Sequence, residues 1–304
     1  MQRSVIIGAL LAVLALLAGC SALRLAYNQG PAWAYWWLDG YVDFNVEQSP
    51  RVRDAIGAWF KWHRSVQLPD YVALLAQAQT EALQPLNAAQ VCRWIGEVEA
   101  RVGSAVEQAL PDAAELARGL TPRQLQHLER KYAKNNQQFA ADYLQDSPAE
   151  RLQASVKRVI ERAEFFYGPL DEAQRVRLAQ GVAESPFDAE LWLIERQRRQ
   201  RDTLQTLRRL SLSKAPDHPE LVEGLSSGEV PAGVAQAALK ALVENALRSP
   251  RPAYRAYQQR LARYNCAFAA QMHQTSTPEQ RRRLAMRLKG WEDDLRVLAG
   301  DAIR

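Results

Sequence analysis

Apolar side chains recur along much of the chain at helical spacing. The clearest run lies near the C-terminus, where intervals of four and three residues join Leu284, Leu288, Trp291, Leu295 and Leu298. Such spacing puts the side chains on one face of an α-helix, and that face is stable only when another helix buries it. Sustained alternation of apolar and polar residues, the pattern of a half-buried strand, is absent from the sequence. The pattern therefore predicts an all-α fold without a sheet.

Short motifs mark the starts of these helices. The segments 121–124, 147–150 and 277–280 each place Ser or Thr at the N-cap, Pro at the first helical position and Gln or Glu at the third. This is a capping box, in which cap and third residue satisfy backbone donors at the helix start. Segments 87–90 and 171–174 are looser versions. Together with the stripes they predict a bundle or array of about ten helices, near 51–66, 69–84, 88–109, 122–145, 148–167, 172–183, 187–209, 232–248, 251–274 and 278–299.

Residues 1–19 have the pattern of a lipoprotein signal peptide. Arg3 precedes an apolar stretch at 5–17 that is too short to span a bilayer. The stretch ends in Leu17-Ala18-Gly19-Cys20, which matches a lipobox with cleavage between Gly19 and Cys20. We expect Cys20 to carry the lipid, and the alternative is an ordinary secretory signal with a chance cysteine. Ser21, in place of Asp, favours the periplasmic face of the outer membrane of a Gram-negative host.

Composition and charge fit one folded domain over residues 20–304. Hydrophobic residues make up 47% of the 304 and charged residues 24%, which argues against extensive disorder. The formal net charge is +5, or +4 once Arg3 is removed with the signal peptide. Such a mild excess does not predict binding to nucleic acid.

Residues 211–229 break the helical pattern. Ser, Pro and Gly dominate the segment SLSKAPDHPELVEGLSS at 211–227, which carries no apolar stripe. It resembles the translated product of a dispersed palindromic repeat. We therefore expect an inserted surface loop, which loop-closure thermodynamics tolerates.

Motifs that would carry chemistry are absent from the sequence. The four histidines form no HExxH array, the cysteines form no CxxC, and neither GxSxG nor a Gly-rich phosphate loop occurs. We therefore expect no catalytic residue, no cofactor and no metal, and a protein that is not an enzyme. Asp39 and Asp43 are spaced like a glycosidase pair, but the favoured interpretation is that they cap helices beside an aromatic core.

Aromatic residues crowd the segment after the proposed anchor. They are Trp33, Tyr35, Trp36, Trp37, Tyr41 and Phe44. Packing in the core is the favoured interpretation. The alternative is a position on the membrane, because Trp and Tyr favour the headgroup region.

Two cysteines remain besides Cys20, in a compartment that is expected to be oxidising. Cys92 and Cys266 are each flanked by apolar residues on a predicted helix. We predict that they form a disulfide, and the alternative is two buried free thiols.

Basic residues gather in two predicted helices. The members chosen as a candidate cationic surface are Arg196, Arg199, Arg208, Arg282 and Arg287. Such a surface would suit lipopolysaccharide phosphates, anionic lipid or an acidic protein. The alternative is a pair of solvated faces whose arginines pair with nearby carboxylates.

Longer stretches carry a resemblance to a known family. The resemblance rests on the lipobox and on four segments: LRLAYNQGPAWAYWWLDGYVDF at 23–44, WFKWHRSVQLPDY at 59–71, RPAYRAYQQRLARYNC at 251–266 and LKGWEDDL at 288–295. The chain is similar to a family of uncharacterised Gram-negative envelope lipoproteins, which is known only as a domain of unknown function. The resemblance implies an envelope location and an all-helical fold, but no activity.

A weaker resemblance concerns repeated helix starts. LTPRQ at 120–124, LDEAQ at 170–174 and TPEQRRRL at 277–284 look like the LTxxQ motifs of periplasmic stress chaperones, which hold unfolded proteins without ATP. We expect a lipid-anchored interaction or scaffold protein of the outer membrane, with an envelope protein or an anionic envelope component as partner. The alternatives are a membrane-tethered chaperone and a hydrolase of envelope polymers.

Overall fold

The computed structural model describes residues 22–211 and 230–300, and their regular structure is helical throughout. The predicted all-α fold is confirmed. The expected signal peptide, Cys20 and most of the expected insertion lie outside the described residues. In chain order the elements are Ala22–Asn28 (α2), Gly30–Val42 (α3), Gln48–Trp62 (α4), the π-helical His63–Gln67 (η1), Leu68–Ala82 (α5), Ala88–Arg118 (α6), Pro122–Tyr143 (α7), Pro148–Tyr167 (α8), Glu172–Ala183 (α9), Ala189–Ser211 (α10), Ala232–Leu247 (α11), Pro252–Gln274 (α12) and Pro278–Gly300 (α13).

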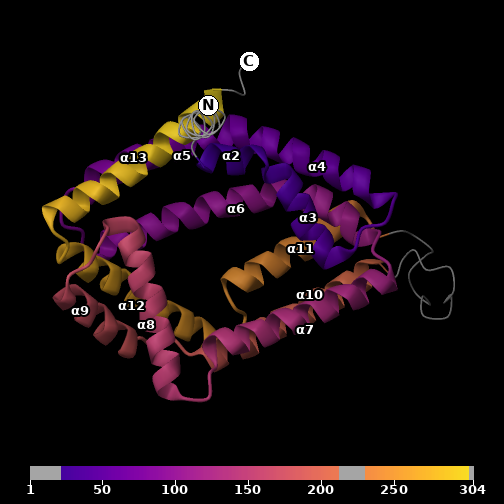
Figure 1. Ribbon diagram of the computed structural model, residues 1–304. Coiled ribbons are helices and arrows are strands. Elements are labelled where there is room, and N and C mark those ends of the chain that lie inside the picture. The colour runs from indigo at the N-terminus through magenta and orange to yellow at the C-terminus, as the bar shows by residue number, and fades with distance from the viewer. Residues whose placement is uncertain (1–21, 212–229, 301–304) are drawn as a thin grey trace, which may run out of the picture.

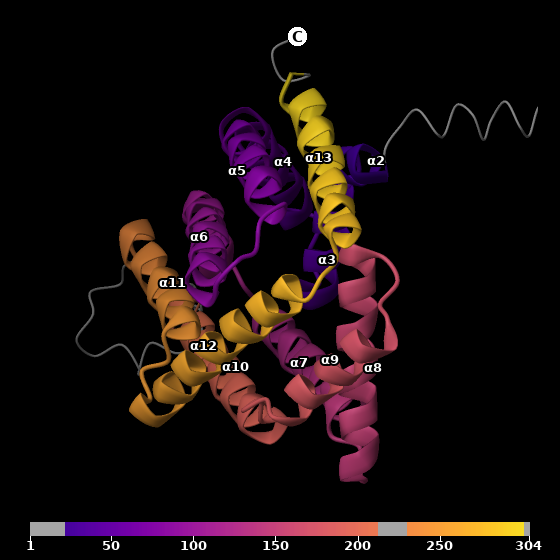
Figure 2. The same ribbon diagram turned by 90° about the vertical axis from the view of Figure 1, so that its left-hand side faces the viewer.

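The helices are arranged as a ring that the last helix closes (Figure 1). Helices α2, α4, α5 and α13 form one side, α7, α10 and α11 form the opposite side, and α8, α9 and α12 lie at one end. Helix α6 runs between the two sides. Helix α13 packs along α5, so residues more than 200 positions apart in sequence lie side by side, as the turned view in Figure 2 also shows.

Two apolar cores hold the ring together. The first joins α6, α7, α10 and α11 through Ala114, Ala117, Leu120, Leu125, Leu128, Leu204, Leu207, Leu210 and Ala235. The second joins α8, α9 and α12 through Leu170, Leu178 and Met272, with Phe268 and Tyr167 packed against it. On α7, Leu125, Leu128 and Tyr132 have helical spacing and face the first core, so one apolar face of this helix is buried, as such spacing requires.

Two helices differ from the sequence prediction at proline. The expected gap between residues 66 and 69 is absent, because η1 joins α4 to α5, with the Leu68 amide donating to the carbonyl of His63. Helix α6 continues past the expected end at residue 109 to Arg118, with Pro111 inside it. Buried Leu110 and Ala114 lie on either side of Pro111, and the packing of this face sustains the helix despite the missing N–H.

Polar contacts close the ring where α12 meets the α5–α6 connection. His273 is 1% exposed, and its Nε2 lies 2.7 Å from the carbonyl oxygen of Gln84. Its Nδ1 lies 2.9 Å from the hydroxyl of Tyr167. The side-chain amide of Gln274 donates to the carbonyl of Leu86. These bonds fix the end of α12 against helices from both halves of the chain.

Candidate functional site

Helix α2 begins at residue 22, two residues after Cys20, and is held firmly on the ring. One contact is an ion pair with α13, and the other two are hydrogen bonds to η1. They join Arg24 to Asp294 at 3.1 Å, the Tyr27 hydroxyl to His63 Nδ1 at 2.9 Å, and the Arg64 guanidinium to the Asn28 side chain at 2.7 Å. A group attached to Cys20 would therefore lie next to a rigid part of the fold.

Helix α3 exposes three tryptophans. Trp33, Trp36 and Trp37 are 57%, 63% and 63% exposed, whereas Tyr35 is only 5% exposed. The favoured expectation of core packing is therefore wrong for the tryptophans and right for Tyr35. Positions 33, 36 and 37 have the spacing of one helix face, and Tyr35 lies on the other side, where it is buried.

Aromatic rings surround His63 at the π-helical turn. Its ring stacks on Trp59 at 4.7 Å and meets the edge of Tyr71 at 5.4 Å. Burial lowers the pKa of His63 and raises the pKa of Tyr27 to about 12. Both groups are therefore neutral at neutral pH and suited to a fixed hydrogen bond. His63 is thus a partly buried, hydrogen-bonded residue that holds this turn against α2.

Asp39 and Asp43 serve the end of α3. An Asp39 carboxylate oxygen accepts from the amide of Phe44 at 2.9 Å, and its carbonyl accepts from the amide of Asp43 at 2.8 Å. Asp43 is the C-cap, with a φ of 58° that Asp tolerates better than most residues. The Asp43 side chain lies 3.4 Å from Arg123. These contacts match the capping interpretation and not that of a carboxylate pair facing a cleft.

The five arginines of the candidate cationic surface are not brought together. Arg196, Arg199 and Arg208 lie on α10, and Arg282 and Arg287 lie on α13, on the other side of the ring (Figure 1). Several make contacts within the fold: Arg199 pairs with Glu195, Arg208 pairs with Glu129, Arg196 lies over Trp192, and Arg287 lies over Phe165. A single continuous cationic surface is therefore not formed.

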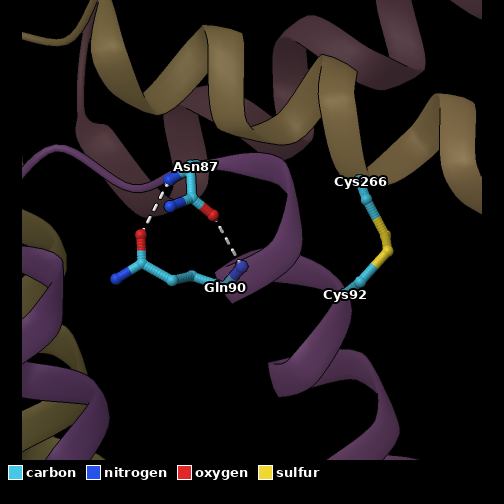
Figure 3. The surroundings of a disulfide bond; sticks show 4 residues. All are labelled: Asn87, Gln90, Cys92 and Cys266. Atoms are coloured by element: carbon cyan, nitrogen blue, oxygen red, sulfur yellow. Dashed lines mark hydrogen bonds between the residues drawn. A yellow bond between two sulfur atoms is a disulfide. The ribbon is translucent and has the colours of Figure 1, made fainter.

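Cys92 and Cys266 form a disulfide between α6 and α12. Their Sγ atoms are 2.03 Å apart, and 174 residues separate them in sequence. Figure 3 shows the bond one turn after the start of α6, where Asn87 and Gln90 exchange the two hydrogen bonds of a capping box. The helix start and the cross-link therefore lie together.

Sites for a metal and spans for a membrane were sought in residues 22–211 and 230–300. No group of three or more His, Cys, Asp or Glu side chains lies close enough to hold a metal ion there. No helix within these ranges combines the length and apolar character needed to cross a bilayer.

Comparison with known proteins identifies one relationship. The family of unknown function DUF6279 matches residues 40–223, which is more than half of the chain. The chain belongs to the DUF6279 family. No curated protein and no solved structure matches it. The part of the chain shared with DUF6279 begins near the end of α3 and continues past α10 to residue 223, and the three exposed tryptophans precede it.

Two pairs of glutamine side chains hydrogen-bond each other in this structure, and the first pair lies within the segment that matches DUF6279. Gln124, third residue of α7, exchanges side-chain hydrogen bonds with Gln48 of α4, with the shorter contact at 2.6 Å. In the same way Gln174 of α9 bonds Gln280 of α13. We call each a glutamine clasp. The motif glutamines that resemble LTxxQ thus join pairs of helix starts in this structure.

A buried carboxylate was missed in the sequence. Glu195 is fully buried and accepts hydrogen bonds from Ser249 at 2.7 Å and Arg198 at 2.8 Å, with Arg251 at 3.3 Å. Burial alone would raise the pKa of Glu195, but Arg198, Ser249 and Arg199 lower it to about 2. The carboxylate ties α10 to the start of α12. Only a general clustering of charge on α10 signalled it in the sequence.

Proposed function

We propose that this protein is a lipid-anchored interaction or scaffold protein at the periplasmic face of the outer membrane. The observation that carries the proposal is the position of α2, which begins two residues after Cys20 and is fixed to the ring by the Arg24–Asp294 ion pair and the Tyr27–His63 hydrogen bond. A lipid on Cys20 would hold the ring at the bilayer surface without a long tether. A rigid ring held in this way can present its helices to an envelope partner.

The stiffness of the ring supports this role. Two glutamine clasps, a disulfide between α6 and α12, and the buried Glu195 each join segments that are distant in sequence. Such cross-links restrict motion of whole helices, and a preorganised surface loses less conformational entropy when it binds.

Anchoring is tested by labelling with palmitate. A Cys20→Ala chain should take up no label, retain residues 1–19 and leave the membrane fraction on detergent-free washing. The matched control is a Cys92→Ser/Cys266→Ala chain, which also loses cysteines and should still be labelled. If the Cys20→Ala chain were processed and membrane-bound, the proposal would be wrong.

The interaction role is tested by photo-crosslinking in intact cells. A photoreactive residue at Val98, which is 52% exposed on α6, should give a discrete adduct with an envelope component. The same residue at Leu247, 61% exposed on α11, provides a comparison on another helix. Absence of a discrete adduct at every exposed helix position would contradict an interaction function.

One observation favours a second candidate, a membrane-tethered chaperone that works without ATP. Helix α6 exposes Ile95, Val98 and Val102, an apolar row at helical spacing. Exposed apolar rows of this kind can bind unfolded polypeptide. The soluble chain should then suppress aggregation of a denatured protein near equal molar ratio, without nucleotide. A Val98→Ser/Val102→Ser chain should lose the effect, and no suppression at tenfold excess would remove this candidate.

A further inference from the structure

We propose that the exposed face of α3 inserts into the headgroup region of the bilayer that holds the lipid of Cys20. The face is formed by Trp33, Trp36 and Trp37, which we call the tryptophan face. The inference rests on the proposed function, because it assumes that Cys20 is acylated. It adds a second membrane contact, made by side chains, and so sets the orientation of the ring on the membrane.

The tryptophan face has the composition of an interfacial helix surface. Three tryptophans that are each more than half exposed form a large apolar surface for a folded protein. Asp39 is the only charged residue on α3, and its carboxylate is engaged by the Phe44 amide at the helix end. Tryptophan combines an apolar ring with an N–H donor, and it concentrates where hydrocarbon meets headgroups.

The opposite side of α3 is fixed to the ring, so the tryptophans cannot simply turn inward. Tyr35 is buried and donates a hydrogen bond from its hydroxyl to Ser49 at 3.0 Å. The guanidinium of Arg53 lies 3.4 Å from the centre of the Tyr35 ring. At the start of the helix, a Cβ on Gly30 would lie 2.6 Å from a ring carbon of Phe60, so only glycine allows this approach. These contacts set the rotation of α3 and leave the tryptophan face outside.

The distance to the anchor favours a bilayer as the occupant of this face. Trp33 follows Cys20 by 13 residues, and all but a few of these are helical in α2 and α3. At 1.5 Å per helical residue the path is about 20 Å long, less than the thickness of a bilayer's hydrocarbon core. Acyl chains on Cys20 would therefore keep the tryptophan face close to the headgroups at all times. A contact that is too weak to form from solution becomes favourable at such an effective concentration.

Arg53 adds a polar partner at the edge of the face. Arg53 is an exposed residue, and its guanidinium carbon lies 5.6 Å from the centre of the Trp36 ring. A guanidinium beside an inserted indole can bind a lipid phosphate while its stem covers the ring. Aromatic rings in the interface with an arginine at headgroup level are the usual composition of a membrane-surface helix.

The test uses the acylated full-length protein in vesicles of phosphatidylethanolamine and phosphatidylglycerol. Part of the lipid is brominated at shallow acyl positions, where bromine quenches the fluorescence of nearby indoles. We expect the protein to be quenched, and a Trp33→Ser/Trp36→Ser/Trp37→Ser chain to lose this quenching. The remaining tryptophans serve as internal reference. The matched control is Leu247→Ser, at an equally exposed apolar position on α11, which should leave quenching unchanged.

Palmitate labelling of the same samples separates the two proposals. If the protein carries palmitate but its fluorescence is quenched equally with and without the three tryptophans, the membrane contact of the tryptophan face is overturned and the lipid anchor is not. Unlabelled protein would overturn the proposed function. The wild-type protein could instead form an oligomer in detergent that the triple variant does not form, and show no quenching in vesicles. That result would assign the tryptophan face to contact with a second copy and would also overturn the inference. Unchanged thermal midpoints are expected, since the substituted side chains are exposed, and a Trp→Phe triple variant provides a conservative comparison.

Discussion

The side-chain amides of Gln174 and Gln280 hydrogen-bond each other in both directions, at 2.8 and 3.0 Å. Each amide also donates to a main-chain carbonyl just before the partner helix: Gln174 to Thr275 at 3.1 Å and Gln280 to Pro169 at 3.0 Å. Each glutamine side chain further accepts from the backbone amide of its own N-cap residue. One residue type thereby caps its own helix and ties that helix to a second one.

Gln48 and Gln124 repeat this arrangement at the opposite end of the ring, where α4 meets α7 (Figure 1). Gln48 donates to the carbonyl of Gly119 at 2.9 Å, and Gln124 donates to the carbonyl of Asp43 at 3.1 Å. In three cases the accepting carbonyl lies two residues before the partner's N-cap. In the fourth case the carbonyl of Asp43 lies two residues before Asn45, whose side chain accepts from the backbone amide of Gln48. The repetition indicates that these glutamines are structural elements of the ring, independent of any role in binding.

Breaking a clasp is therefore expected to destabilise the fold. Gln280→Ala leaves the buried amide of Gln174 without its partner, at a cost of about 1–3 kcal/mol in the free energy of unfolding. A double-mutant cycle with Gln174→Ala should show a coupling of about 1 kcal/mol or more, from urea unfolding. The control is Gln138→Ala, an exposed glutamine whose side chain donates to Asp142 one turn away on the same helix, with a change under about 0.5 kcal/mol. Equal effects of Gln280→Ala and Gln138→Ala would contradict the clasp.

Removing the Cys92–Cys266 disulfide is expected to lower stability strongly. The bond closes a loop of 174 residues, and the chain-entropy model assigns such a loop about 5 kcal/mol, near the upper end of values for native disulfides. Because Cys266 is 2% exposed, the test pairs Cys92→Ser with Cys266→Ala. We expect a lower thermal midpoint, and no further change on adding reductant. Mass spectrometry of the alkylated, unreduced wild-type chain should find neither thiol labelled.

Local signals in the sequence located most helices, because they depend on a few neighbouring residues. The capping boxes at Thr121 and Thr277 are correct in type and position, and the apolar stripe from Leu284 to Leu298 lies on a helix, α13, that packs along α5. The pairing of the motif glutamines was not predicted, since it depends on which helix starts meet in space. One helix-start signal was missed, Asn45 followed three residues later by Gln48. The Asn45 side chain accepts from the backbone amide of Gln48 at 2.8 Å, as the cap residues do in the other capping boxes.

Composition alone could not decide which aromatic residues of the segment 33–44 are buried. Six aromatic residues within twelve positions suit a core or a membrane surface equally well, and helical spacing separates Tyr35 from Trp36 and Trp37 only once the partner of α3 is known. Here α4 contacts the side of Tyr35, which leaves the tryptophans outside. The break predicted before the proline at residue 69 was wrong, because the π-helical turn η1 joins α4 to α5 at that point.

Loss of the ion pairs of buried Glu195 is expected to lower the free energy of unfolding strongly. Glu195→Gln removes the charge that faces Arg198 and Arg251, and breaking a buried pair in this way costs about 3–5 kcal/mol. Since the donors lower its pKa to about 2, below the usual 4.5, the unfolded chain binds the proton more readily. Stability from this group is complete above about pH 4.5 and is lost as pH falls toward 2. Urea unfolding at pH 7 and at pH 3 should show a smaller difference in Glu195→Gln than in the wild type.

His273 makes stability sensitive to pH in a higher range. The Gln84 carbonyl can only accept, so Nε2 carries the hydrogen and Nδ1 accepts from Tyr167. Burial lowers the pKa of His273, with Arg281 adding to the effect and the bond to Gln84 opposing it. The folded pKa then lies below the unfolded value of about 6.5, so the unfolded chain binds more protons, and stability falls as pH drops below about 6.5. The slope from this histidine is at most about 1.4 kcal/mol per pH unit, and His63, shifted in the same direction, adds to it. Urea unfolding between pH 7.5 and 5 should give a shallower slope for His273→Gln, whereas Gln274→Ala, its uncharged neighbour, should keep the wild-type slope.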